Sequence, residues 1–380
     1  MRIAAAAFVL AVALAAPAEA RDVPGSLEAH AYVYADSWRG WPVAPVDAQH
    51  PIRGSFLDPR PDGYHIGVDV NVRDDRPEPD APPQRTHRVY ALEGGIVSLP
   101  DNVARVGCVN RKVEVGHFSY WHVDPIGTVA AGQPVAPGQM IGWTCTTMWH
   151  VHVSEWVQSE GRRVWVNPLH RGGKLAPFAD TRPPRVHSVR FFAPAATDWV
   201  EGPTDAIAAP GAGRELPRLR LRGLVDVRAL VSDPQSFLGW FADAHPTLAA
   251  DHRPQRVRIE LTRLADGRRV VARDVFRADA LDEPGRLLPP FDAPVPFRVH
   301  YAPGTLQNLG AHPCVLGLQP RSCQGRYWLR LFARSGGAYW NTRLARDGRY
   351  RLVVRAWDAA GNAASTAVTI GLRNGLRSRE

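Results

Sequence analysis

The segment Trp149-His150-Val151-His152-Val153-Ser154-Glu155 alternates valine with histidine and serine. A two-residue period is typical of a β-strand, in which successive side chains point to opposite faces. Both imidazoles therefore lie on one face, with Cα atoms roughly 7 Å apart. One of them could bind a metal ion while the other stands over the same site. Two histidines on one strand also occur on ordinary polar faces, which is the alternative.

Short β-prone runs surround this segment in the first half of the chain. Residues 94–99 and 112–115 are two of them; glycine and proline turns separate the runs, and no long stretch has the 3.6-residue period of a helix. The proline-rich residues 76–83 predict an exposed insertion loop, because consecutive prolines cannot serve a sheet interior. A second proline-rich stretch, Arg182-Pro183-Pro184, predicts a linker between two domains.

After the linker, apolar and polar residues alternate cleanly. Residues 225–229 are one example, and residues 256–261 and 350–356 repeat the pattern, which predicts half-buried antiparallel strands and an Ig-like β-sandwich. Residues 234–254 and 280–323 fit no strand pattern and are interpreted as insertions. The sequence therefore predicts a mostly β protein. A β-rich domain spans residues 21–182, and a sandwich domain spans 183–380.

The first 20 residues have the features of a secretory signal peptide. Arg2 supplies the positive charge, residues 4–16 are a short apolar segment, and Ala18-Glu19-Ala20 is an A-x-A cleavage site. We expect cleavage after Ala20 and a secreted or periplasmic protein, with an uncleaved anchor as the alternative. No later stretch approaches the roughly 20 apolar residues of a transmembrane helix, so stable membrane insertion is not expected.

The chain has four cysteines and a formal charge of +9. Cys314 and Cys323 are close enough to close one loop, which leaves Cys108 to pair with Cys145, and disulfides suit an oxidising compartment. Neither pair has CxxC spacing, which argues against a redox site or a cysteine-bound zinc ion. Nearly all basic residues are arginine, and a basic exported surface attracts anionic wall polymers or lipid headgroups rather than nucleic acid. A compositional preference for arginine is the alternative.

The segment His65-Ile66-Gly67-Val68-Asp69 offers two further metal ligands. Gly67 at its centre disfavours a helix, and in a straight strand the two Cα atoms would be about 13 Å apart. Sharing one ion therefore requires a bend, which Gly67 makes easiest. His65, Asp69 and one histidine of the later pair form a two-histidine, one-carboxylate set, which suits zinc with an open position for water.

Two more histidines, His117 and His122, lie in the run Val115-Gly116-His117-Phe118-Ser119-Tyr120-Trp121-His122-Val123. Spare imidazoles near such an ion could move protons and stabilise an oxyanion. Either of these two could equally be a structural histidine.

Six motifs in this order resemble the lysostaphin/LytM-type zinc metallopeptidases. The resemblance covers about residues 51–157, which it implies are the core of the first domain. The motifs are Pro51-Ile52-Arg53-Gly54-Ser55-Phe56, His65-Ile66-Gly67-Val68-Asp69, Tyr90-Ala91-Leu92-Glu93-Gly94-Gly95-Ile96-Val97, Tyr120-Trp121-His122-Val123, Gly132-Gln133-Pro134-Val135-Ala136-Pro137-Gly138-Gln139-Met140-Ile141-Gly142 and His150-Val151-His152-Val153-Ser154-Glu155.

The resemblance implies a compact antiparallel-β fold with one zinc ion per chain at the floor of a groove. His65 and Asp69 match the first two ligands of the family's H-x-x-x-D motif, and His152 matches the third, the second histidine of H-x-H. His150 and His122 match the two catalytic histidines. The implied function is an exported zinc metallo-endopeptidase that hydrolyses peptide bonds in bacterial peptidoglycan.

Two stretches depart from the family pattern, which leaves the substrate preference open. The family's glycine-rich approach to H-x-H is here residues 143–149, and its Phe-Gly-x-Arg is here residues 56–60. A Cys108–Cys145 bridge would brace the chain just ahead of the catalytic strand. His117 is expected to be structural, and three histidines without partner spacing are expected to be bystanders: His87, His170 and His187.

Two other functions remain open at this point. One is a non-catalytic wall-binding or amidase-activating protein on the same fold. The other is a cupin-type enzyme that uses the His-x-His pair, for which His170 is the only nearby candidate for a further ligand. The partner of the second domain is unknown; it positions the enzyme, contacts a protein or acts as a spacer.

Overall fold

The computed structural model describes most of the chain beyond the predicted signal peptide. The predicted cleavage site and the Cys314–Cys323 bridge lie outside the described residues. No helix within the described residues is long and apolar enough to span a bilayer. The described residues are 34, 36–60, 63–72, 76–100, 107–146, 150–159, 161–170, 172–195, 199–200, 207–208, 213–236, 252–278, 280–282, 286–287, 300–302, 305, 327–333 and 337–375.

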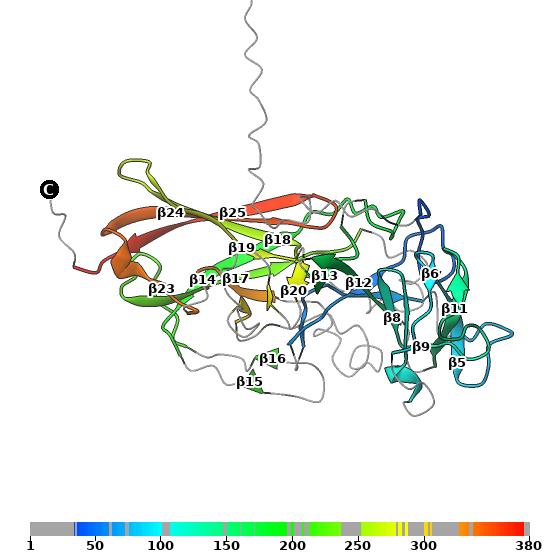
Figure 1. Ribbon diagram of the computed structural model, residues 1–380. Helices are drawn as coiled ribbons and strands as arrows, with labels where there is room; N and C mark the ends of the chain where they lie inside the picture. The colour runs from blue at the N-terminus through cyan, green and yellow to red at the C-terminus, as the bar shows by residue number, and fades with distance from the viewer. Residues whose placement is uncertain are drawn as a thin grey trace, which may run out of the picture.

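The structure is mostly β with antiparallel pairing, as the sequence predicts (Figure 1). Its main sheet has the strand order β1-β4-β12-β13-β20-β21, and β8 pairs with β12 and β7. These strands are β1 (Ile52–Gly54), β4 (Val68–Asn71), β7 (Lys112–Val115), β8 (Phe118–Trp121), β12 (His150–Ser159), β13 (Arg162–Val166), β20 (Ala280–Asp282) and β21 (Arg286–Leu287).

Alternation along β4 and β12 separates the core from the polar face of this sheet. Val68 and Val70 of β4, like Val151 and Val153 of β12, are fully buried in the hydrophobic core. Asp69 and His152 are paired across the two strands, and their side chains point to the opposite face because alternate residues change sides. The pairing of β4 with β12 therefore places Asp69 of the first histidine–aspartate motif beside His152 of the His-x-His motif, on the same face of the sheet.

Smaller sheets complete the first half of the chain. A three-stranded sheet has the order β5-β11-β9, and two-stranded sheets are formed by β10 with β6 and by β2 with β3. Their bounds are β2 (Pro59–Arg60), β3 (Gly63–Tyr64), β5 (Arg85–Tyr90), β6 (Gly95–Ile96), β9 (Val123–Asp124), β10 (Pro134–Val135) and β11 (Met140–Cys145), with a short 3-10 turn, η2, at Cys108–Asn110.

The second half of the chain forms two further four-stranded sheets. One has the order β14-β17-β22 with β23 beside β17, and the other has the order β19-β18-β24-β25. The strands are β14 (Arg185–Phe192), β17 (Leu224–Ser232), β18 (Arg256–Arg263), β19 (Arg269–Arg277), β22 (Tyr327–Arg330), β23 (Trp340–Asn341), β24 (Gly348–Trp357) and β25 (Ala363–Leu372); β15 (Trp199–Val200), β16 (Ile207–Ala208) and the turn η4 (Thr342–Leu344) lie outside these sheets.

The predicted alternation is observed in β18 and β24 but not in β17. Every second residue is buried along β18 (257, 259 and 261) and along β24 (350, 352, 354 and 356), and the residues between them are partly or fully exposed. In β17, however, Asp226 and Arg228 are buried as well. Asp226 accepts hydrogen bonds from Arg228 at 2.8 Å and from Arg330 of β22 at 3.3 Å. A paired buried charge of this kind cannot be distinguished from a solvent-facing charge in a sequence pattern.

The first part of residues 280–323, which fits no strand pattern in the sequence, contains two short strands. β20 pairs with β13, and β21 pairs with β20, so both extend the main sheet of the first half. These strands are three and two residues long, too short for an alternating pattern to be recognised. The chain therefore returns from its second half to complete the sheet that carries the two motifs.

Two buried histidines of the second half predict acid sensitivity. Burial lowers the pKa of His252 and of His300 to about 3, with neighbouring arginines adding to the effect. The unfolded chain binds these protons below about pH 6.5 and the folded chain does not, so the free energy of unfolding falls as the pH drops below 6.5. Each histidine contributes a slope of roughly 1 kcal/mol per pH unit.

We therefore expect His252→Gln to have a shallower loss of stability between pH 6.5 and pH 4.5 than the unsubstituted protein. Urea unfolding at several pH values measures both slopes. Equal slopes in the two proteins would contradict the buried, uncharged state of His252.

Candidate metal centre

Three potential metal ligands from the two motifs meet beside β4 and β12. His65 Nε2 lies 3.1 Å from Asp69 Oδ1, and His152 Nδ1 lies 3.1 Å from the same oxygen. The two nitrogens are 2.7 Å apart. All three side chains are buried, and their donor atoms are grouped closely enough to hold one metal ion.

His65 reaches this group because the chain bends before β4. The strand begins at Val68, and His65 lies in the preceding turn, where Leu57 N donates to its carbonyl at 2.7 Å. A Cβ atom on Gly67 would lie 2.2 Å from the carbonyl oxygen of Val153. Only glycine therefore lets the bend pass this close to β12.

The second nitrogen of each ligand imidazole has its own partner. His65 Nδ1 is 2.8 Å from the carbonyl oxygen of Ser55, which only accepts, so Nδ1 carries the proton and the Nε2 lone pair faces Asp69. His152 Nε2 is 2.7 Å from Ser154 Oγ. Such outer contacts are usual for metal-binding imidazoles, because they fix the tautomer and the ring orientation.

The donor set fits a small tetrahedral ion. Ligand atoms about 2.0–2.1 Å from a tetrahedral zinc ion are about 3.3 Å apart. The observed separations of 2.7, 3.1 and 3.1 Å are close to that spacing. Two imidazole nitrogens and one carboxylate oxygen also leave a fourth position for water or substrate.

His150 and His122 stand beside these three side chains. The ring centroids of His122 and His150 are 4.9 Å apart, and those of His122 and His152 are 6.5 Å apart. His150 Nε2 lies 3.6 Å from Asp69 Oδ1. The structure thus brings together all five residues that the sequence singled out.

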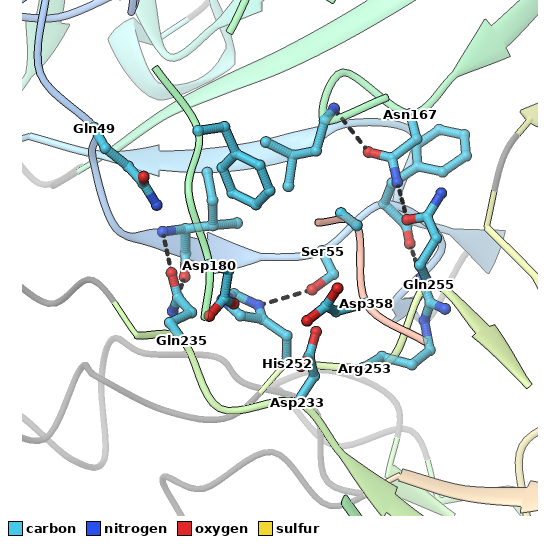
Figure 2. A pocket seen from close by; sticks show the side chains of 15 residues that line it. Gln49, Ser55, Asn167, Asp180, Asp233, Gln235, His252, Arg253, Gln255 and Asp358 are labelled. Carbon is cyan, nitrogen blue, oxygen red and sulfur yellow. Dashed lines mark hydrogen bonds between the residues drawn. The ribbon is translucent and has the colours of Figure 1, made fainter. Parts of the chain in front are cut away.

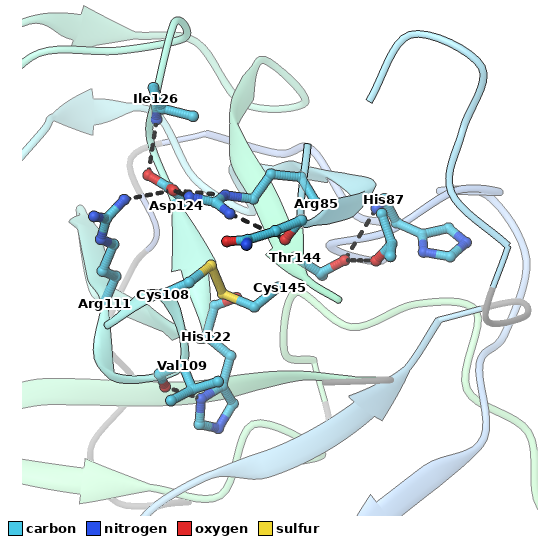
Figure 3. Close-up of a disulfide and its surroundings, with 12 residues drawn as sticks. Arg85, His87, Cys108, Val109, Arg111, His122, Asp124, Ile126, Thr144 and Cys145 are labelled. Carbon is cyan, nitrogen blue, oxygen red and sulfur yellow. Dashed lines mark hydrogen bonds and ion pairs between the residues drawn. A yellow bond between two sulfur atoms is a disulfide. The ribbon is translucent and has the colours of Figure 1, made fainter. Parts of the chain in front are cut away.

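The backbone around His122 is held by the Cys108–Cys145 disulfide (Figure 3). Val109, next to Cys108, offers its carbonyl oxygen to His122 Nδ1, and Cys145 N donates to the His122 carbonyl at 3.3 Å. His122 has a φ of 65°, which is uncommon for a residue other than glycine and needs such support. The expected bridge is present, and it braces a candidate catalytic residue.

We expect the double variant Cys108→Ser/Cys145→Ser to lose activity but to keep its metal. The 37-residue separation of the two cysteines implies a stabilisation of about 3–4 kcal/mol from the bridge in the chain-entropy model. On one preparation, urea unfolding measures the stabilisation lost with the bridge, metal analysis checks that the metal content is kept, and rate measurements test the loss of activity. An unchanged rate would show that the bridge does not position His122.

Burial and nearby charges define the protonation states of the cluster. Burial lowers the pKa of His122 to about 4, although its contact with Val109 acts in the opposite direction. Burial also holds the pKa of His150 well below its usual value. At neutral pH the cluster therefore combines a carboxylate with two uncharged imidazoles.

Arg53 is a site residue that the sequence did not reveal. Its Nη1 donates to His150 Nδ1 at 2.9 Å. A guanidinium has no acceptor, so His150 Nδ1 is unprotonated and the proton lies on Nε2, on the side of Asp69. His122 has the opposite arrangement, because its Nδ1 donates to Val109 and its Nε2 keeps the lone pair. Arg53 lies in the first of the six motifs, but its contact with His150 depends on the strand order β1-β4-β12, which that motif does not reveal.

His117 and His170 of the first half have other contacts. His117 Nδ1 lies 2.8 Å from Glu93 Oε2, and His170 Nε2 lies 3.1 Å from Glu155 Oε1. Glu155 is an odd number of residues from both His150 and His152, so it faces the other side of β12. A cupin-like ligand set that includes Glu155 and His170 is therefore not formed with the histidine pair.

Comparisons with family models, with curated proteins and with solved structures found no match for this chain. The resemblance to the LytM-type peptidases stays a prediction from the motif residues.

Proposed function

We propose that this chain is an exported zinc metallo-endopeptidase that hydrolyses peptide bonds in bacterial peptidoglycan. The observation that carries the proposal is the convergence of His65 Nε2, Asp69 Oδ1 and His152 Nδ1, with two uncharged imidazoles beside them. The substrate class follows from the six family-like motifs and from the predicted signal peptide.

His65, Asp69 and His152 would hold one zinc ion. When bound, zinc polarises a peptide carbonyl and makes a water molecule a better nucleophile. His122 Nε2 keeps its lone pair and the ring is uncharged at neutral pH, so this nitrogen is available to accept a proton from the attacking water. His150 carries its proton on Nε2 and donates a hydrogen bond to the carbonyl oxygen as negative charge develops there.

Arg53 positions His150 in this scheme. Its charge also opposes protonation of that ring. The two histidines therefore have different roles, with His122 as base and His150 as hydrogen-bond donor. This division rests on the backbone carbonyl that binds one ring and the guanidinium that binds the other.

Incubation of the mature protein with purified sacculi, with and without a chelator, tests the proposal. We expect soluble muropeptides whose new amino termini mark a cleaved peptide bond, and no release after chelation. A metal-loaded protein that binds sacculi and releases nothing would favour the non-catalytic, amidase-activating alternative. His150→Ala, which removes the donor and leaves all three metal ligands, is the matched control for passive binding.

A further inference from the structure

The segment Ile52–Asp58 connects the candidate metal centre to the second half of the chain. On one side, the Ser55 carbonyl orients His65 and the Arg53 guanidinium orients His150. On the other side, Gln235, His252 and Arg253 line a pocket together with residues 52, 55 and 56 of this segment (Figure 2). Tyr301 contacts the same segment at the Leu57 carbonyl.

Four residues of the second half make hydrogen bonds to this segment. Gln235 donates to the Ile52 carbonyl and accepts from the Ile52 N–H, both at 2.8 Å. His252 Nδ1 lies 2.8 Å from Ser55 Oγ. Arg253 donates to the Phe56 carbonyl, and Tyr301 donates to the Leu57 carbonyl at 2.8 Å.

Leu57 shows why this support is needed. It is fully buried and has a φ of 66°, a conformation that a bulky residue adopts only when its surroundings hold it there. Its carbonyl accepts from Tyr301, and its N–H donates to the His65 carbonyl at 2.7 Å. One strained residue thus lies directly between the second half of the chain and a metal ligand.

We propose that the second half of the chain positions the metal centre, through Tyr301, His252, Arg253 and Gln235 acting on residues 52–58. This inference rests on the proposed metal site, and it gives the second half of the chain a structural role in supporting that site. Without these contacts, Ser55 and Arg53 lose the support that aims them at His65 and His150. The consequence is a weaker and less ordered metal centre in an otherwise folded protein.

Two tyrosines of the second half give a matched test. Tyr301→Phe removes the hydroxyl that donates to the Leu57 carbonyl. Tyr350→Phe removes a hydroxyl that donates to the Arg346 carbonyl at 2.6 Å, which is not part of the segment Ile52–Asp58. Both tyrosines are buried, and both changes keep the ring. Tyr350→Phe therefore controls for the loss of a tyrosine hydroxyl that donates to a backbone carbonyl.

Two measurements use the full mature chain. Competition with a chromophoric chelator gives the affinity for zinc, and the visible absorption spectrum of the cobalt-substituted protein reports on the geometry of the site. Loss of a hydrogen bond that supports a metal ligand typically lowers the metal affinity about 10–100-fold. We expect Tyr301→Phe to lower the zinc affinity about tenfold and to change the cobalt spectrum. Tyr350→Phe should keep the parent affinity and spectrum. Equal affinities and identical spectra in the two variants would overturn the proposal.

Ser55→Ala supplies a second variant should Tyr301→Phe fail to fold. It removes only the hydroxyl that contacts His252 and keeps the carbonyl that binds His65. We expect it to weaken zinc binding as well, and unchanged binding would contradict the proposal. An unsubstituted protein that binds no metal contradicts the metal centre itself. Metal binding without digestion of sacculi contradicts the proposed reaction alone, because affinity still reports on the positioning.

Discussion

Asp69→Ala is expected to lose both the proposed metal binding and the proposed activity. The side chain is the one carboxylate of the donor set, and its Oδ1 is within 3.1 Å of both ligand imidazoles. Its removal leaves two neutral nitrogens, which bind a divalent cation far more weakly than a set that includes an anion. We expect the affinity for zinc to fall by more than about a thousandfold. Calorimetric titration of the metal-free protein measures the loss.

Asn71→Ala is the matched control for this change. Asn71 is the next residue on the same face of β4 and is equally buried, but it is not part of the donor group. Its substitution should leave the metal in place. Zinc binding by Asp69→Ala with the affinity of the control would remove Asp69 from the ligand set.

His122→Ala is expected to lower the rate of hydrolysis by about 10²–10⁴-fold while the metal stays bound. The imidazole is the base in the proposed mechanism, and its nitrogens are not among the three grouped donor atoms. Because the pKa of His122 is lowered to about 4, the uncharged form persists well below pH 6.5. The activity of the unsubstituted protein should therefore fall only toward pH 4, as long as zinc remains bound.

His117→Ala is the control for His122→Ala. His117 lies in the same stretch of sequence, but it is bound to Glu93 and stays outside the cluster. We expect it to retain the parent rate. Steady-state rates and zinc content, measured together, separate a lost base from a lost metal. A similar loss of rate in both variants would assign the effect of His122→Ala to folding.

Local sequence patterns predict the strands of this protein better than the contacts between them. The alternation in residues 150–155 predicts β12 and places His150 and His152 on one face, and Ser154 on that face could have been inferred in the same way. Gly67, at the centre of the segment from His65 to Asp69, predicts the bend that brings these two residues together. These features depend on residues that are neighbours in the chain, so the sequence displays them.

Contacts between distant strands were not predictable in this way. Arg53 reaches His150 because β1 and β12 both pair with β4, and this order is decided by the whole core. The burial of Asp226 in β17 was not predictable for the same reason, because its partner Arg330 lies in β22. The extension of the main sheet by β20 also required the second half of the chain to fold back on the first.

The central claim is that three side chains share one metal ion, and an anomalous difference map at the zinc absorption edge tests it most directly. Crystals of the mature protein should show one peak about 2.0–2.2 Å from each of three atoms: His65 Nε2, Asp69 Oδ1 and His152 Nδ1. A zinc-soaked crystal with no peak at this position, or with these atoms turned away from it, would contradict the account.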